Sequence, residues 1–258
     1  MTVAAAPRLS DQQLIELLGL IEDSDSVELK LTVPDSNLSA GAVALGMDPL
    51  DAQIRQVFFF DTPDLRLNEA GVVARARRVQ GRGDDSVVKL RPVVPGDLSK
   101  KLRRSPSFGV EVDAMPGGFV CSGSMKQRLE KPIVRKKILS EGRIRSFFSK
   151  EQRAFFAEHA PEGLELDDLS VLGPILVLKL RVSPKELDRR LVGEIWLYPD
   201  GSRIVELSTK CAPQEAFDVA AQARAFLAAR DLAPADEQQT KTKKALEYFS
   251  AGMNESED

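Results

Sequence analysis

The sequence predicts an α+β protein organised around a closed antiparallel β-barrel, and three patterns lead to this prediction. Several segments alternate strictly between charged and apolar residues, which is the two-residue period of a β-strand. Clusters of glycine, proline, aspartate and serine separate these segments, and helical periodicity appears near both ends and in one internal stretch. Because each strand has an apolar face, we expect the charged faces to point into the barrel and helices to cover its outside.

Composition bounds the class of protein and its compartment. The 258 residues are 43% hydrophobic and 29% charged, which is typical of a soluble globular domain. The 36 basic and 39 acidic residues nearly cancel, so sequence-specific nucleic-acid binding is not expected. No apolar run could cross a membrane, and the N-terminal segment lacks the pattern of a signal peptide. With only two, widely separated cysteines, we expect a cytoplasmic protein with no membrane partner.

Two strands in the first half of the chain carry the densest basic pattern. After the turn-forming residues 61–64, alternation places Arg75 and Arg77 on one strand face. The next alternating segment follows a glycine-rich turn and places Lys89 and Arg91 on one face. Four cations on neighbouring strands repel one another unless an anion or carboxylates lie between them. The pattern therefore indicates an anion site, with a solvated outer sheet face as the simpler alternative.

The remaining elements extend this design along the chain. Residues 10–21 predict a short amphipathic helix that begins with a capping box. Residues 26–33 predict a strand whose charged face carries Glu28 and Lys30. A short helix is expected at 39–47 to cover the apolar outside of the barrel.

The second half of the chain adds acidic strands and more helices. Residues 110–113 predict a short strand with Glu111 and Asp113 on one face. A helical insertion is expected at about 119–172, and C-terminal helices are expected at about 213–250. Between them, three further segments predict strands: residues 175–182, 192–198 and 203–210. We expect all of these elements to form one domain over residues 1–258.

The charged residues predicted to face the lumen form a basic and an acidic set. The basic set is Lys30, Arg75, Arg77, Lys89, Arg91, Lys179 and Arg181, with Lys210 at its margin. The acidic set is Glu28, Glu111, Asp113, Glu194 and Glu206. Burying so many charges is costly unless they are paired or hydrated, so we expect a wet tunnel that binds a polyanion and its divalent cations. Arginine and lysine suit phosphate, and the carboxylates suit Mg²⁺ or Mn²⁺.

The order of the charged motifs resembles the CYTH domain, the triphosphate tunnel metalloenzyme family that includes class IV adenylate cyclases, thiamine triphosphatases and inorganic triphosphatases. The matching motifs are Glu28-x-Lys30, Phe60-Asp61-Thr62-Pro63 with Arg75-x-Arg77, Lys89-Leu90-Arg91, Glu111-x-Asp113, Glu206 and the segment 240–246. The resemblance implies an eight-stranded antiparallel tunnel. It also implies that the phosphates are bound by Lys30, Arg75, Arg77, Lys89, Arg91 and Arg181, to which we add Lys179 from its place in the alternating pattern, and that Glu28, Glu111, Asp113 and Glu206 hold metal.

Among the charged residues predicted to face the lumen, we expect Glu28, Lys30 and Glu206 to be catalytic. We expect Glu194 to be a further metal ligand. The sequence departs from the family pattern at Ser26, where the family's Glu-x-Glu-x-Lys strand has its first acid, and at Ser208. Fewer carboxylates imply weaker binding of the second metal, which would be the one that activates water.

Three functions remain open from the sequence. The leading one is a metal-dependent triphosphatase acting on a small-molecule triphosphate or on inorganic polyphosphate. The others are a class IV-type adenylate cyclase that makes cyclic AMP from ATP and a non-catalytic polyphosphate-binding module. A barrel whose internal charges only neutralise one another is the structural alternative. The oligomeric state also remains open, with a homodimer among the options.

Overall fold

The computed structural model describes residues 10–34, 38–129, 133–235, 238 and 240–254. The strands are β1 (Ser26–Val33), β2 (Gln53–Asp61), β3 (Val72–Val79), β4 (Asp85–Leu90), β5 (Phe108–Met115), β6 (Gly118–Arg128), β7 (Ser170–Val182), β8 (Leu191–Leu197) and β9 (Arg203–Cys211). The α-helices are α1 (Asp11–Glu22), α2 (Leu38–Ala44), α3 (Arg66–Glu69), α4 (Lys100–Arg103), α5 (Ile133–Leu139), α6 (Lys150–His159), α7 (Ala216–Ala228) and α8 (Lys241–Asn254). Short 3-10 helices are η2 (Pro49–Asp51), η3 (Pro95–Asp97), η4 (Ile144–Phe147), η5 (Leu166–Asp168) and η6 (Pro213–Glu215).

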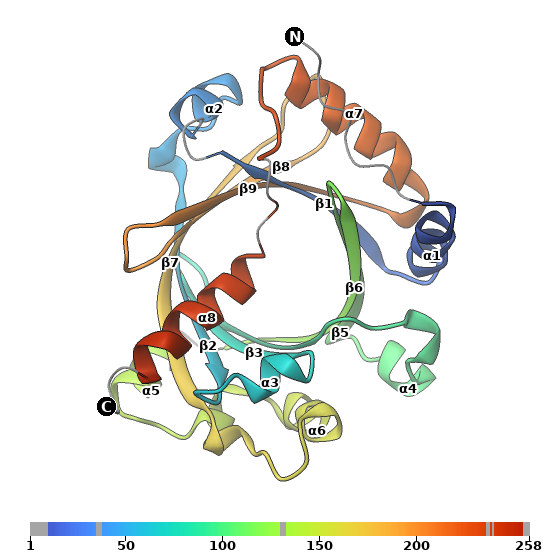
Figure 1. The fold of residues 1–258 in the computed structure, drawn as a ribbon. Helices are drawn as coiled ribbons and strands as arrows, with labels where there is room; N and C mark the ends of the chain where they lie inside the picture. The colour runs from blue at the N-terminus through green and yellow to red at the C-terminus, as the bar shows by residue number, and fades with distance from the viewer. Residues whose placement is uncertain (1–9, 35–37, 130–132, 236–237, 239, 255–258) are drawn as a thin grey trace.

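The described strands close into a barrel in the order β1-β5-β6-β4-β3-β2-β7-β8-β9 (Figure 1). Helices lie outside this barrel, so the predicted α+β class and closed barrel are confirmed. The barrel has nine described strands instead of eight, and β1 runs parallel to β5 while the other neighbours pair antiparallel. The parallel pair matters for the site because its register places Glu28 opposite Asp113 and Ser26 opposite Glu111.

Alternation along β3 decides which side chains enter the lumen. Ala74 and Ala76 are fully buried in a cluster on the outer face of the sheet. Arg75, between them, interacts electrostatically with Glu194 on β8, which lies across the barrel from β3. The arginines of β3 therefore point inward, and the alanines leave room for large side chains to pack on the outside.

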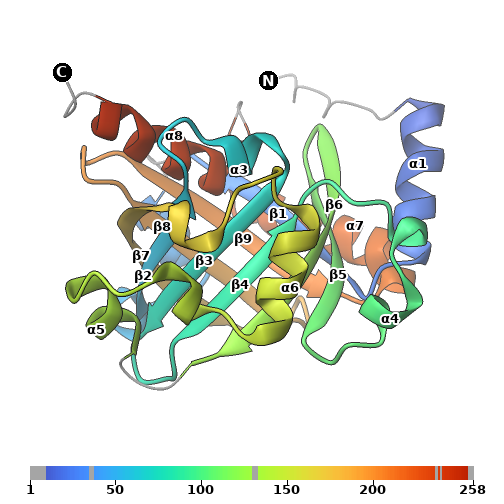
Figure 2. The same ribbon diagram turned by 90° about the horizontal axis from the view of Figure 1, so that it is seen from below.

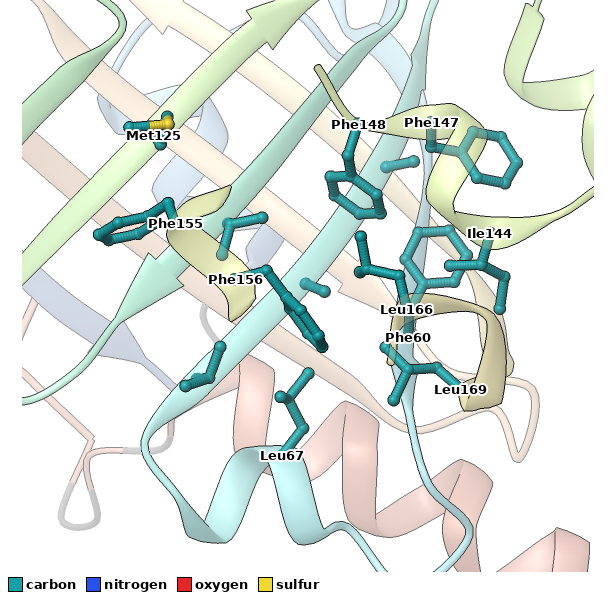
Figure 3. Close-up of a cluster of buried hydrophobic side chains, with 14 of the residues drawn as sticks. Phe60, Leu67, Met125, Ile144, Phe147, Phe148, Phe155, Phe156, Leu166 and Leu169 are labelled. Carbon is teal, nitrogen blue, oxygen red and sulfur yellow. The ribbon is translucent and has the colours of Figure 1, made fainter. Parts of the chain in front are cut away.

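The outer face of β2, β3 and β4 is covered by the segment from α5 to η5. Figure 3 shows its aromatic side chains gathered over the barrel wall. Phe60 from β2 stacks on Phe147 with ring centroids 5.3 Å apart, and it meets Phe148 edge-on at 5.8 Å. Gln152 of α6 is fully buried and donates hydrogen bonds to the carbonyls of Ser86 and Met125, which ties this segment to β4 and β6.

This helical segment is shorter than the predicted insertion at about 119–172. The first ten residues of the predicted insertion belong to strand β6, and its last residues, from Ser170, begin strand β7. Inward-facing Ser122 and Ser124 alternate with outward-facing Cys121 and Met125 along β6. Small polar residues and glycines do not have the composition of a typical strand, which explains why this one was not predicted.

One end of the barrel is covered by α8, which lies across it in Figure 1 and beside α3 in Figure 2. Ala245 and Leu246 of α8 are buried in a cluster with lumen-facing Phe59 and Ile204. The hydroxyl of Ser250 donates a 2.6 Å hydrogen bond to the carbonyl of Pro63. Apolar packing and this bond therefore hold α8 over the opening.

The segment that begins α3 is organised by Asp61, which is 1% exposed. Its carboxylate accepts hydrogen bonds from the backbone N–H groups of Thr62, Leu67 and Asn68 at 2.8, 2.9 and 2.9 Å. The Asp-Thr-Pro motif thus builds the turn that supports α8.

Of the described helices, none is long and apolar enough to span a membrane. The N-terminal segment 1–9, on which the signal-peptide prediction rests, lies outside the described residues.

Candidate functional site

Asp113 is the most buried carboxylate of the lumen, with a side chain that is 0% exposed. Its oxygens lie 2.8 Å from Lys30 Nζ, 3.3 Å from Arg91 Nη2 and 3.7 Å from Lys89 Nζ. Burial alone would raise the pKa of Asp113, but the adjacent lysines and arginine lower it to about 2. Asp113 is therefore ionised at neutral pH and holds one cation from β1 and two from the end of β4.

An acidic cluster forms around this residue. Glu28, Glu111 and Asp113 can each place one carboxylate oxygen within 4.8 Å of the others. Burial alone would raise the pKa of Glu28, but the nearby Lys30 holds it below its usual value. Three carboxylates that converge in this way fit a hard divalent cation, which prefers oxygen ligands. These three residues are therefore the candidate metal ligands of the site.

Ser26 belongs to the edge of this acidic cluster. Its hydroxyl donates a 3.3 Å hydrogen bond to Glu111, whose carboxylate also forms an ion pair with Lys210. Ser26 therefore orients a candidate ligand and contributes no carboxylate of its own.

The opposite wall of the lumen is basic and mostly lacks carboxylates. Among the described residues, Arg55, Arg75 and Lys126 form no ion pair, and Arg75 Nε is buried without a hydrogen-bond partner. Burial, with repulsion from the nearby Arg77, lowers the pKa of Arg75 to about 9 and that of Arg55 to about 10. Arg77 itself makes a bidentate pair with Asp85 at 2.8 and 2.9 Å. Arg55 and Arg75 thus have no carboxylate to balance their charge among the described residues, which indicates a wall that is completed by an anion.

A third wall combines Lys179, Glu194, Glu206 and Lys241 in one chain of ion pairs. Glu194 lies 2.7 Å from both Lys179 Nζ and Lys241 Nζ, and Lys241 Nζ also lies 2.6 Å from Glu206. Burial would raise the pKa of Glu194, but the two lysines hold it well below its usual value. Lys241 is the first residue of α8 and also lies 5.1 Å from the ring centroid of Trp196. The helix that covers the tunnel thus inserts a cation into it.

The end of the barrel away from α8 opens into a cavity of about 720 Å³. Its lining includes Glu28 and Lys179 of the lumen, together with Arg181, Lys210 and the connection from β7 to β8. Arg181 is exposed at this mouth and approaches Gln53 at 3.5 Å. The lumen is therefore continuous with an open, charged mouth at one end.

Comparison with known proteins gives similarity at the level of structure. A candidate adenylyl cyclase from Hippeastrum with a dominant triphosphatase activity superimposes with a TM-score of 0.63 and 16% identity, covering 87% of this chain and 95% of that one. A candidate adenylate cyclase from Bacillus halodurans gives a TM-score of 0.60 and 14% identity, covering 86% and 97%. The chain has a CYTH-type fold. No protein-family model and no curated protein sequence matches it.

In this CYTH-type fold, the residues predicted for the site occupy three different environments. Glu28, Lys30, Lys89, Arg91, Glu111 and Asp113 meet around the acidic cluster. Arg75 and Arg77 lie on the basic wall, and Lys179, Glu194 and Glu206 lie in the ion-pair chain. Arg181 stands apart at the mouth. The five predicted metal ligands are thus divided into a converging group of three and a lysine-bound pair.

Among the described residues of the barrel, sequence reasoning missed the cations Arg55, Lys126 and Lys241. Arg55 precedes the apolar run of β2. It lies on the same strand face as the inward-facing Val57 and Phe59, and this alternation could have identified it as a lumen residue. Lys126 was assigned to the helical insertion, which hid its place on β6. Lys241 was part of a matching motif, but no periodicity in the sequence indicates that a helix end enters the barrel.

Proposed function

We propose that this protein is a divalent-metal-dependent phosphohydrolase that acts on a triphosphate or a longer condensed phosphate. The observation that carries this proposal is the separation of charge in one lumen. The acidic cluster of Glu28, Glu111 and Asp113 shares the lumen with a basic wall of Arg55 and Arg75, which have no carboxylate partner among the described residues. A bound phosphate chain with its metal ion would satisfy both walls at once.

The side chains suggest a division of roles. Arg75, Arg55 and Lys126 would bind phosphate oxygens, with Arg77 held in place by Asp85. Lys30 would bind the phosphate closest to the acidic cluster, since its pKa is raised by Glu28 and Asp113 despite burial and it stays charged. Glu28, Glu111 and Asp113 would hold Mg²⁺ or Mn²⁺. When bound, such an ion neutralises phosphate charge and lowers the pKa of a coordinated water.

The test is phosphate release from tripolyphosphate in the presence of Mg²⁺ or Mn²⁺. We expect release by the wild type and its loss in Arg75→Ala and in Glu28→Gln. Arg78→Ala is the matched control, since Arg78 neighbours Arg77 on β3 but hydrogen-bonds Gln56 and does not enter the ion pairs of the lumen. Absence of release with either metal, from neutral to alkaline pH, would contradict the proposal.

Adenylate cyclase activity is a second candidate, because both structurally similar proteins carry that name. In that reaction the 3′-hydroxyl of ATP replaces water as the nucleophile, and pyrophosphate leaves. Measuring cyclic AMP and free phosphate from ATP in the same samples separates the two activities. Calorimetric binding of tripolyphosphate without turnover would instead favour a binding module, consistent with the missing acid at Ser26.

A further inference from the structure

We propose that the open mouth of the barrel is a second anion-binding site, which holds the distal phosphates of an inorganic polyphosphate chain longer than three units. This site, called the vestibule here, is the 720 Å³ cavity lined by Lys179, Arg181, Lys185, Arg190 and Lys210 with Glu28 at its base. The inference rests on the proposed function in one respect, namely that the lumen holds the leading phosphates of the same chain.

The two ends of the barrel differ in a way that gives a bound chain one direction. At the end covered by α8, the lumen is filled by a cluster that includes Phe59, Trp196 and Leu246. At the other end, Glu28 and Lys179 belong to both the lumen and the vestibule lining. A chain whose first phosphates lie against the basic wall therefore has apolar side chains ahead of it and the vestibule behind it.

The vestibule carries an excess of positive charge that the protein itself does not neutralise. Its lining contains six cationic and two acidic side chains. Arg181, Lys185 and Arg190 are exposed and form no ion pair with any described residue. Arg190 and Arg181 are close enough for their charges to repel, which lowers the pKa of Arg181 in addition to the effect of burial. Three free cations grouped around one cavity favour an anion with several charges.

The other three cations of the lining already have carboxylate partners, Lys179 being paired with Glu194 at 2.7 Å, so the cations without partners lie on one side of the cavity. Arg189 pairs with Glu215 at 2.6 Å, and Lys210 pairs with Glu111. The free cations therefore belong to the end of β7 and the following connection. This connection follows β7, on which Lys179 lies in the lumen and Arg181 at the mouth, so basic side chains are present from the lumen to the exterior.

The chemistry of the lining favours a bare phosphate chain over a nucleotide. A nucleoside at this position would need an aromatic or apolar surface on which its base could stack. Among the described residues that line the cavity there is no phenylalanine, tyrosine or tryptophan, and the apolar ones are Pro184 and Val192. A polyphosphate chain carries a negative charge on every phosphate, so each phosphate in the cavity can interact with the cations of the lining.

The test compares binding of tripolyphosphate and long-chain polyphosphate by calorimetry without divalent metal, so that hydrolysis plays no part. The variant Lys185→Glu/Arg190→Glu reverses two exposed vestibule charges. We expect it to weaken long-chain binding about tenfold, while tripolyphosphate binding changes less than about twofold. Lys101→Glu/Lys136→Glu reverses two exposed charges elsewhere and should leave the ratio of the two affinities unchanged.

The possible results separate this inference from the proposed function. Equal weakening of both ligands, or no weakening of either, overturns the vestibule site even if tripolyphosphate is hydrolysed. Selective loss of long-chain binding supports the vestibule even if no hydrolysis is found with any metal. Tighter binding of a 5′-triphosphorylated oligonucleotide than of long-chain polyphosphate, lost in the same variant, would assign the vestibule to nucleic acid and overturn the inference. Melting temperatures of all variants confirm that each is folded.

Discussion

Lys241, the first residue of α8, places its ammonium nitrogen 2.6 Å from a carboxylate oxygen of Glu206 on β9. The same nitrogen lies 2.7 Å from Glu194 on β8. Burial opposes the charge on Lys241, but the two carboxylates raise its pKa above the usual value. One side chain therefore links the covering helix to two strands and balances two carboxylates that would otherwise repel each other.

Replacing Lys241 with methionine should destabilise the protein by about 3 kcal/mol, because among the described residues it leaves the buried Glu206 without an ion-pair partner and Glu194 with only Lys179 and the indole of Trp196. The measurement is the free energy of unfolding from denaturant titration at neutral pH. Lys243→Met is the matched control, since Lys243 is exposed and its pair with Glu247 has an N···O distance of 3.7 Å. The control should change the stability by less than about 0.5 kcal/mol. Equal effects of the two substitutions would show that the ion-pair chain does not stabilise the fold.

The closed barrel followed from the sequence because strict alternation leaves few other ways to bury one apolar face on every strand. Arg75 and Arg77 were placed correctly for this reason, as parity alone separates them from Ala74 and Ala76. Strand β6 was missed because serine and glycine residues resemble a loop in composition, although in the barrel Ser122 and Ser124 fill inward positions next to larger charged residues.

The internal pairing of charges could not be predicted from the sequence. Parity indicates that Glu194 and Glu111 both enter the lumen, but it does not say which cation each will meet. Glu111 lies near Glu28 because their strands, β5 and β1, are parallel neighbours. Glu194 lies on β8, in another part of the wall, where it pairs with lysines. Strand order is a long-range property that local patterns do not encode.

Acid should destabilise the metal-free protein through Asp113. Its folded-state pKa of about 2 lies below the usual value of 3.8, so its contribution is fully present above pH 3.8 and is lost as the pH falls to about 2. The contribution amounts to about 2 kcal/mol. The measurement is the free energy of unfolding over this pH range with a chelator present. Asp113→Asn should be less stable at neutral pH and should lose this part of the pH dependence; an unchanged slope would contradict the prediction.

Arg75→Met should stabilise the protein without ligand while it weakens ligand binding. Arg75 has a buried Nε without a hydrogen-bond partner, has no carboxylate partner among the described residues and is repelled by Arg77, so an apolar side chain of similar length should raise the free energy of unfolding by about 1 kcal/mol. The same change should remove most of the increase in melting temperature that tripolyphosphate causes in the wild type. Arg78→Met, on the same strand, should retain this increase. Loss of stability in Arg75→Met without ligand would show that Arg75 is part of the structural core and not reserved for an anion.

Ser26→Glu should strengthen metal binding at the acidic cluster. Ser26 lies opposite Glu111 in the register of β1 and β5 and donates a hydrogen bond to it, so a carboxylate at this position would lie next to the three candidate ligands. An added carboxylate should increase the affinity for Mn²⁺ about tenfold in a calorimetric titration. Ser26→Ala removes only the hydrogen bond and should leave the affinity within about twofold of the wild type. If Ser26→Glu instead binds Mn²⁺ no better than Ser26→Ala, Glu28, Glu111 and Asp113 do not form the metal site, and the cations around Asp113 would be its permanent partners.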